Sequence, residues 1–282
     1  MEIFDSHTHI NSHEFDNDIP DVIERAKALD VTKMLVIGYD DDSRKKLQEI
    51  IQEYPHIYGA VGCHPEDALN YNAEYEQELR KYLELEKFVA VGEIGLDYYH
   101  DSPKKVQHEV FEKQIALAQE LKLPISVHNR DAFEDCYAIL KNMNIQKNGG
   151  IMHSFNGDTT WAEKFLDLGM ELSYSGVVTF KSAKGVQESM MMTPLEHMLV
   201  ETDAPYLTPM PYRNRMNEPA MTRYTLEFIA EKREISSEEL AEITRKNTER
   251  VLKINEWERQ NEDKRSNCCW RKRWYKTNSN GS

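Results

Sequence analysis

The sequence contains no hydrophobic run long enough to span a membrane. Its longest apolar runs, such as Met34–Ile37 and Phe88–Val91, have the length of a β-strand, whereas a membrane-spanning helix needs about 20 apolar residues. The first residues include neither a basic segment nor an apolar one, so we expect no signal peptide. These absences predict a cytoplasmic protein without a membrane anchor.

Cysteine is scarce, and the four cysteines show neither a disulfide framework nor the spacing of a zinc ribbon. They are Cys63, Cys136, Cys268 and Cys269, and we interpret the adjacent last two as exposed thiols. This usage fits a reducing compartment. The sequence also lacks a Gly-x-Gly-x-x-Gly motif after its first predicted strand, which argues against a dinucleotide-binding domain.

Positive charge is in short supply. The 282 residues include 35 lysines and arginines against 49 acidic residues, which gives a net charge of −14. A protein that binds along the DNA backbone needs basic side chains, so this class is disfavoured. An enzyme that takes a nucleic-acid end into a metal-lined pocket remains possible, because bound cations supply local positive charge.

The C-terminal segment differs in composition from the rest. Residues 264–282 contain six basic side chains and no acidic ones, so that residues 1–263 carry a net charge of −20. Trp270 and Trp274 interleave with these cations, a pattern that would suit stacking on nucleic-acid bases. The alternative is a disordered terminal segment, which we favour. We therefore expect one barrel domain over residues 1–256 and a basic, disordered tail over 257–282.

Short apolar runs alternate with longer amphipathic segments along most of the chain. We expect strands at 2–6, 33–38, 57–62, 88–93, 124–128, 150–153, 170–174 and 197–201. We expect helices near 19–29, 43–54, 73–86, 104–122, 131–142, 158–168, 183–192, 219–231 and 236–255, with Ser43 and Ser236 as N-caps. This alternation predicts βαβ units and a parallel sheet. Eight units would close a (β/α)₈ TIM barrel, and an open doubly wound sheet is the rival fold.

Side chains that can bind metals follow several of these apolar runs. His7 and His9 follow the first run and should face the same way, because strand side chains alternate. Four others occupy the ends of later runs: Glu93, His128, His153 and Asp203. In a barrel, the C-terminal ends of all strands meet at one mouth. One polar residue there is usually a satisfied core group, but six on five strands predict a shared site, since burying each without a partner would be costly.

The chemistry of these six side chains suits divalent metal ions. Four imidazoles and two carboxylates, with no thiolate, would hold Zn²⁺, Mn²⁺, Fe²⁺ or Mg²⁺, although Mg²⁺ prefers an all-oxygen set. A glutamate can bridge two ions, and two ions about 3.5–4 Å apart clamp the attacking and leaving oxygens of a displacement at phosphorus. The set predicts a metal-dependent hydrolase with two divalent cations (Zn²⁺, Mn²⁺ or Mg²⁺).

Six sequence blocks resemble those of the TatD family of metal-dependent deoxyribonucleases, which belongs to the amidohydrolase-like barrels. The blocks are Phe4–His9, Gly62–Pro65, Gly92–Tyr98, His128–Arg130, His153–Phe155 and Glu201–Leu207. They occur in order and with family-like spacing, and the resemblance extends from about residue 2 to about residue 254. A single block would be weak evidence, whereas the ordered set is specific.

The resemblance implies a role for each matching residue. His7, His9, Glu93 and Asp203 would bind the first ion, and Glu93, His128 and His153 would bind the second. Glu93 and Asp203 would be the catalytic residues, with Asp203 either both ligand and proton acceptor or ligand alone.

Other positions of the matching blocks are implied to lie around these ligands. His64 resembles a position beside the substrate phosphate, and the alternative for it is a turn histidine before Pro65. Asp97 and Arg130 are interpreted as supporting residues.

One segment departs from the family pattern. Asn214 stands where members usually have glycine, and Met216 stands where they usually have a basic residue. Asparagine tolerates left-handed backbone angles, so the turn should survive, but the loss of a cation puts phosphate affinity or substrate preference in doubt. Arg213 and Arg215 remain as candidate substrate contacts beside His64.

The leading functional hypothesis is a 3′–5′ exonuclease that prefers single-stranded DNA ends. A barrel mouth accepts one splayed nucleotide more easily than a duplex, and the family resemblance points to the 3′ end. The first rival is a related barrel enzyme that hydrolyses an amide, lactone or acyl ester bond, since such enzymes share the His-x-His pattern of His7 and His9. Many of them use a bridging carboxylated lysine where Glu93 stands here, and this difference favours the nuclease. The second is an inactive barrel that serves as a binding module. No feature of the sequence indicates a protein partner.

Overall fold

The computed structural model describes residues 1–254, and it places eight parallel strands in one sheet with the order β1 to β8. The strands are β1 (Ile3–Thr8), β2 (Val31–Gly38), β3 (Ile57–Val61), β4 (Phe88–Asp97), β5 (Ile125–Arg130), β6 (Gly150–Met152), β7 (Met170–Tyr174) and β8 (Met198–Val200). The His7 carbonyl accepts from the Asp203 N–H at 2.9 Å, and the His9 N–H donates to the Ala204 carbonyl at 2.9 Å. These bonds bring β1 beside the segment that follows β8, and the predicted TIM barrel is confirmed.

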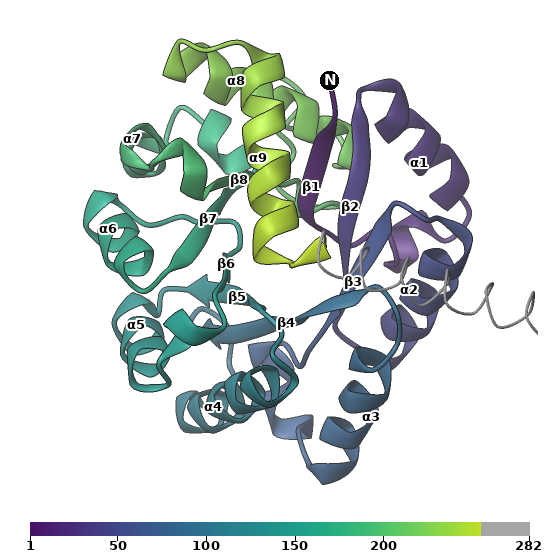
Figure 1. Cartoon of the computed structure of the whole chain (residues 1–282), viewed down its shortest axis with the longest axis vertical. Coiled ribbons are helices and arrows are strands. Elements are labelled where there is room, and N and C mark those ends of the chain that lie inside the picture. Colours follow the sequence, from purple (N-terminus) through teal and green to yellow (C-terminus); the bar gives the residue numbers. More distant parts are fainter. Residues whose placement is uncertain (255–282) are drawn as a thin grey trace, which may run out of the picture.

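Helices surround the strands on the outside of the barrel (Figure 1). They are α1 (Ile19–Ala28), α2 (Asp41–Glu53), α3 (Ala73–Leu83), α4 (Lys104–Leu121), α5 (Phe133–Asn142), α6 (Thr159–Asp167), α7 (Lys184–Met192), α8 (Thr222–Arg233) and α9 (Ser237–Val251). Short 3₁₀ turns lie between them, including η2 (Pro65–Asn70) and η6 (Pro219–Met221). None of the helices in residues 1–254 is long and apolar enough to cross a membrane.

Short polar side chains fix where the helices begin. Ser236 caps α9 as predicted, because its hydroxyl accepts from the Glu239 N–H at 3.1 Å. The prediction for Ser43 was wrong: Asp40 is the N-cap of α2, and its carboxylate accepts from the Ser43 N–H at 2.8 Å. The Ser43 hydroxyl in turn accepts from the Asp40 N–H at 3.0 Å, so the two residues form a capping box.

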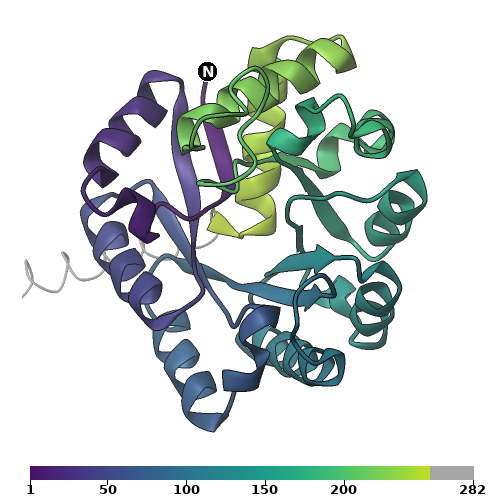
Figure 2. The same ribbon diagram turned by 180° about the vertical axis from the view of Figure 1, so that it is seen from behind.

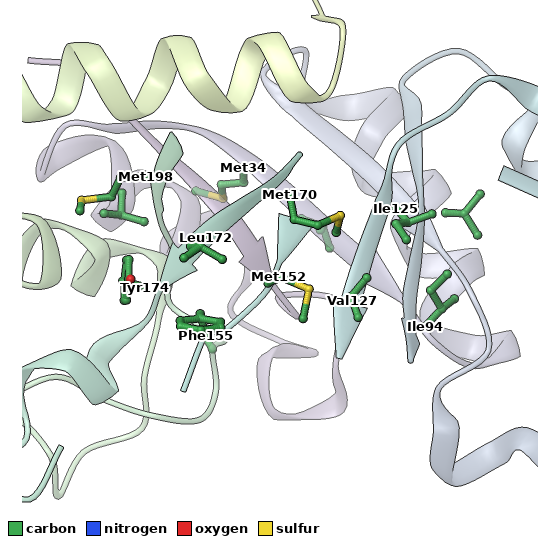
Figure 3. Packing of buried hydrophobic residues seen from close by; sticks show 14 of the residues in the cluster. Met34, Ile94, Ile125, Val127, Met152, Phe155, Met170, Leu172, Tyr174 and Met198 are labelled. Carbon is green, nitrogen blue, oxygen red and sulfur yellow. The ribbon is translucent and has the colours of Figure 1, made fainter. Parts of the chain in front are cut away.

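The strands are hydrophobic on both faces, as expected for a parallel sheet that is covered by helices. One buried cluster lies between the strands and the outer helices, and Figure 3 shows part of it, including Val127, Met152 and Leu172. A second cluster combines residues of the strands, such as Phe4 and Leu199, with the end of α9 and the residues just after it. Helix α9 thus covers the end of the barrel where the strands begin, and Figure 2 views the barrel from the opposite side.

A buried ion pair joins α9 to the barrel. The Glu249 carboxylate accepts from Lys33 Nζ on β2 and from an Arg245 guanidinium nitrogen, both at 2.8 Å. Burial alone would raise the pKa of Glu249, but hydrogen bonds from these two cations outweigh burial and hold the pKa below its usual value. The ionised carboxylate therefore stabilises the fold above its unfolded-state pKa of about 4.3, and that stabilisation is lost as the pH falls.

We expect Glu249→Gln to lower the free energy of unfolding by about 2 kcal/mol at neutral pH, because two charge-assisted hydrogen bonds are weakened. The difference from the wild type should shrink as the pH falls to about 4 and below, because the native carboxylate then becomes protonated. Urea unfolding at several pH values measures both quantities. Glu242→Gln is the matched control, since Glu242 pairs with Lys246 on the exposed face of α9 and should change stability little. A difference that did not vary with pH would contradict this account.

Residues 255–282 lie outside the described part of the chain. The predicted tail over 257–282, with Trp270, Trp274, Cys268 and Cys269, therefore remains a prediction from sequence. Cys63 and Cys136 lie within the described residues, where both are buried and neither forms a disulfide.

Candidate metal centre

The six predicted ligands converge at the end of the barrel where the strands finish. His7 lies on β1, Glu93 on β4 and His128 on β5. His9 and His153 directly follow the ends of β1 and β6, and Asp203 lies in the segment just after β8. With the exception of His128 and Asp203, which are partly buried, all are buried. They line, or lie just beneath, a cavity of about 760 Å³.

Gly95 allows β4 and β5 to approach each other at this site. It pairs with His128 across the two strands, and its φ of +147° is a backbone angle that other residues rarely adopt. A Cβ atom here would lie only 1.9 Å from the His128 carbonyl oxygen. The glycine in the block Gly92–Tyr98 is thus required for the position of His128.

The two carboxylate oxygens of Glu93 face different histidines. Oε2 lies 3.4 Å from His7 Nε2 and 3.8 Å from His9 Nε2. Oε1 lies 2.8 Å from His128 Nδ1 and 2.7 Å from His153 Nε2. One carboxylate therefore stands between two pairs of imidazoles, and this arrangement allows each oxygen to contribute to a separate ligand set.

Asp203 completes the group of donors on the His9 side. Its Oδ1 lies 3.3 Å from His9 Nε2 and 3.8 Å from His7 Nε2. Its φ of +56° is uncommon for a residue with a side chain. Two backbone hydrogen bonds hold this conformation: the Asp203 N–H donates to the His7 carbonyl, and the Asp203 carbonyl accepts from the Tyr206 N–H, both at 2.9 Å.

The electrostatics of the centre are those of carboxylates and imidazoles packed together. Burial would raise the pKa of Glu93, but His153 and His7 outweigh burial and hold the pKa well below its usual value. Burial and the neighbouring His153 lower the pKa of His7. His7 Nε2 and His9 Nε2 approach to 3.2 Å. Two ring nitrogens this close, beside a carboxylate, fit a shared cation.

These donor atoms meet the geometric requirement for a metal site. The ligand atoms of His7, His9 and Glu93 lie within 4.8 Å of one another, as do those of His7, His153 and Asp203. The mixed nitrogen and oxygen set fits a divalent transition metal. The residues therefore fit a bound divalent cation.

Two further carboxylates orient the histidines from behind. Asp97 Oδ2 lies 2.9 Å from His128 Nε2, so the other ring nitrogen of His128 faces Glu93. Glu201 Oε1 lies 3.3 Å from His153 Nδ1 and accepts from the Ser154 N–H at 2.8 Å. Carboxylates in this position fix the tautomer and the ring orientation of a metal-binding histidine. The supporting position expected for Asp97 is observed. Glu201 was not singled out from the sequence, although it lies two residues before Asp203 and strand alternation could have suggested it.

His64 faces the same cavity. Burial lowers the pKa of His64 to about 3, so the imidazole is neutral at neutral pH. Its Nδ1 accepts from the Glu66 N–H at 3.3 Å, which leaves the ring proton on Nε2. Nε2 lies 3.7 Å from Glu93 Oε1 and so presents a donor to the cavity. His64, Glu93 and His128 are also close enough to share an ion, but that would require the opposite tautomer.

The two arginines predicted as substrate contacts lie elsewhere. The Arg213 guanidinium stacks 4.2 Å from the Phe180 ring centroid, and that of Arg215 lies 5.5 Å from the Tyr212 ring centroid. Both arginines are exposed, and neither is among the described residues that line the cavity. Asn214 and Met216 are exposed beside them.

Comparison with known proteins identifies the family. The family model described as TatD related DNase matches residues 4–253. The chain belongs to the TatD family. It is 45% identical over 254 residues to the uncharacterized metal-dependent hydrolase YabD of Bacillus subtilis, a match that covers 90% of this chain and all of the relative. This TatD-family protein is accordingly a metal-dependent hydrolase.

Two other relatives bear on its activity and structure. The 3′-5′ ssDNA/RNA exonuclease TatD of a Rahnella species is 32% identical over 260 residues, which cover 90% of this chain and 99% of the relative. The crystal structure of YJJV, a TatD homolog from Escherichia coli K12, superposes with a TM-score of 0.83 at 28% identity and covers 89% of this chain and 97% of that one. The TatD-family barrel is thus preserved along nearly all of the described chain.

Proposed function

We propose that this protein is a 3′–5′ exonuclease that removes nucleotides from single-stranded DNA with two divalent cations bridged by Glu93. The observation that carries the proposal is the placement of the Glu93 carboxylate, whose two oxygens face separate pairs of imidazoles. His7, His9 and Asp203 would hold one cation with Glu93, and His128 and His153 would hold the other. Bound Zn²⁺, Mn²⁺ or Mg²⁺ would bear the negative charge that develops at phosphorus.

The chain's own residues supply the remaining chemistry. Asp203 faces the cavity and would accept a proton from the attacking water. Burial would raise its pKa, but the hydrogen bond with His9 outweighs burial and holds the pKa low, so the carboxylate is ionised at neutral pH. His64 would donate from Nε2 to a phosphate oxygen of the substrate. Asp97 and Glu201 would hold His128 and His153 in the required tautomers.

Two observations favour a phosphodiester over an amide or ester substrate. The end of β4 holds Glu93 and no lysine, whereas many of the rival barrel enzymes would carry a carboxylated lysine there. In addition, a TatD relative whose match covers 90% of this chain is named a 3′-5′ ssDNA/RNA exonuclease. The cavity volume of about 760 Å³ suits a nucleotide at a strand end better than a continuous duplex.

A time course on a 5′-labelled single-stranded oligonucleotide tests this proposal. We expect a ladder that shortens by one nucleotide at a time, because only an end can enter the cavity. A covalently closed circle of the same sequence should stay intact over the same time, and an RNA oligonucleotide run in parallel establishes the preference for DNA. Cleavage of the circle at the rate of the linear strand would show endonuclease attack and contradict the proposal.

A further inference from the structure

The cavity wall is strongly acidic for an enzyme with a polyanionic substrate. Five carboxylates line it: Glu66, Asp67, Glu93, Asp97 and Asp203. Metal ions at Glu93 and Asp203 would attract the phosphate that is cleaved, but the next phosphate along the strand would meet Glu66 and Asp67 without any cation from the centre. Within residues 1–254, Arg130 is the only lysine or arginine that lines the cavity.

Among the described residues, Arg130 is held in place by an aromatic stack and not by an ion pair. It is the last residue of β5, and its guanidinium carbon lies 3.9 Å from the centroid of the Tyr99 ring. Tyr99 is itself 64% exposed, so this stack lies at the surface of the protein. In the described part of the chain, Arg130 forms no ion pair with a carboxylate. Stacking occupies a face of the planar group and leaves the N–H donors along its edge free for a phosphate.

The position of Arg130 along β5 also fits a second phosphate. It lies two residues beyond His128, so the two side chains leave the strand on the same side, about 6.6 Å apart at their Cα atoms. Successive phosphates of an extended single strand have a comparable separation. Asn129, which separates them in the sequence, also lines the cavity, and its buried amide oxygen and nitrogen have no hydrogen-bond partner among the described residues. The Arg130 guanidinium thus provides hydrogen-bond donors in the cavity wall beyond the metal centre.

We propose that Arg130, supported by Tyr99, binds the phosphate on the 5′ side of the one that is cleaved. The inference rests on the proposed exonuclease function and adds to it the residue that engages the rest of the strand. It assigns to Arg130 the contact that the sequence suggested for Arg213 and Arg215, which stack on Phe180 and Tyr212 outside the lining of the cavity.

The test combines a protein change with a substrate change. Two oligodeoxynucleotides are compared, one with ordinary phosphates and one in which the phosphate 5′ to the cleaved linkage is a neutral methylphosphonate. For the wild type, kcat/KM should fall about tenfold with the methylphosphonate, because a charge-assisted contact is lost. For Arg130→Gln, kcat/KM on the ordinary substrate should fall by about the same factor. The methylphosphonate should then reduce kcat/KM of this variant little further, because the contact is already lost.

Controls separate binding from a structural role. Lys164→Gln removes a cation that stacks on Trp161 at 4.0 Å outside the cavity, and it should behave like the wild type with both substrates. Arg130→Met, which can still pack on Tyr99, replaces the glutamine variant if that one unfolds, and the same loss of sensitivity is expected.

Two results would overturn the inference. If Arg130→Gln stayed as sensitive to the methylphosphonate as the wild type, Arg130 would not contact this phosphate, although the exonuclease function would stand. If the metal-loaded wild type hydrolysed neither oligonucleotide, the proposed function would fail and the inference with it.

Discussion

Replacing Glu93 with alanine is expected to reduce hydrolysis by about a thousandfold or more and to reduce the number of bound metal ions. The carboxylate stands between the His7–His9 pair and the His128–His153 pair, so its loss weakens both ligand sets at once. Charge stabilisation by such ions amounts to several kcal/mol, and about 4 kcal/mol corresponds to a thousandfold change in rate. No other single ligand faces both pairs in this way.

Metal analysis of the purified protein and rate measurements with added Mn²⁺, Mg²⁺ or Zn²⁺ check this expectation. A strong chelator should abolish activity in the wild type, and divalent cations should restore it. Glu112→Ala, on the exposed face of α4, is a matched control that should keep both metal and activity. Full activity of Glu93→Ala, or of the wild type in chelator, would contradict the proposed mechanism.

Asp203→Asn should lower kcat by about a thousandfold, within the range reported for the loss of a general base. Asparagine keeps the shape of the side chain and one oxygen that can face His9, but it cannot accept a proton from water at neutral pH. The substitution therefore separates the two roles that the sequence left open for Asp203, ligand alone or ligand and base.

The measurement is kcat as a function of divalent-ion concentration. If Asp203 is a base, saturating metal should leave the Asp203→Asn variant slow, because the missing proton acceptor is not replaced. Recovery to within about tenfold of the wild-type kcat at high metal would show that Asp203 acts as a ligand alone. A thermal melt excludes unfolding as the cause, which is a necessary control since the φ of +56° at Asp203 depends on local hydrogen bonds.

The fold could be predicted from the sequence because two local patterns indicate each strand. An apolar run of strand length is followed by polar residues and then by a helix of nine or more residues, and this pattern repeats along the chain. The structure differs mainly at the ends of elements. For example, β4 continues to Asp97 instead of ending near Glu93, because its far end stays paired with β5 through Asp97 and Arg130. The expected helix over 219–231 begins with the 3₁₀ turn η6, and α8 starts at Thr222.

The residues of the candidate site could also be predicted from the sequence, because the topology of a barrel brings them together. Parallel strands of a barrel all finish at the same end, so residues that follow the apolar runs must come together, however far apart they lie in the chain. His7 and Asp203 illustrate this, since 196 positions separate them and their side chains approach to 3.8 Å. The family resemblance then supplied an expected role for each member.

What the sequence by itself determined is the barrel, the family and the set of side chains at its mouth, because periodicity and strand direction depend on local patterns. Only the tertiary structure decided which oxygen of Glu93 faces which histidine, and that Asp97 and Glu201 stand behind His128 and His153. It also placed Arg130 in the cavity wall, while Arg213 and Arg215 stack on aromatic rings elsewhere. Such choices depend on side-chain rotamers, on the stagger between strands and on the course of the loops, which arise from packing among residues distant in sequence.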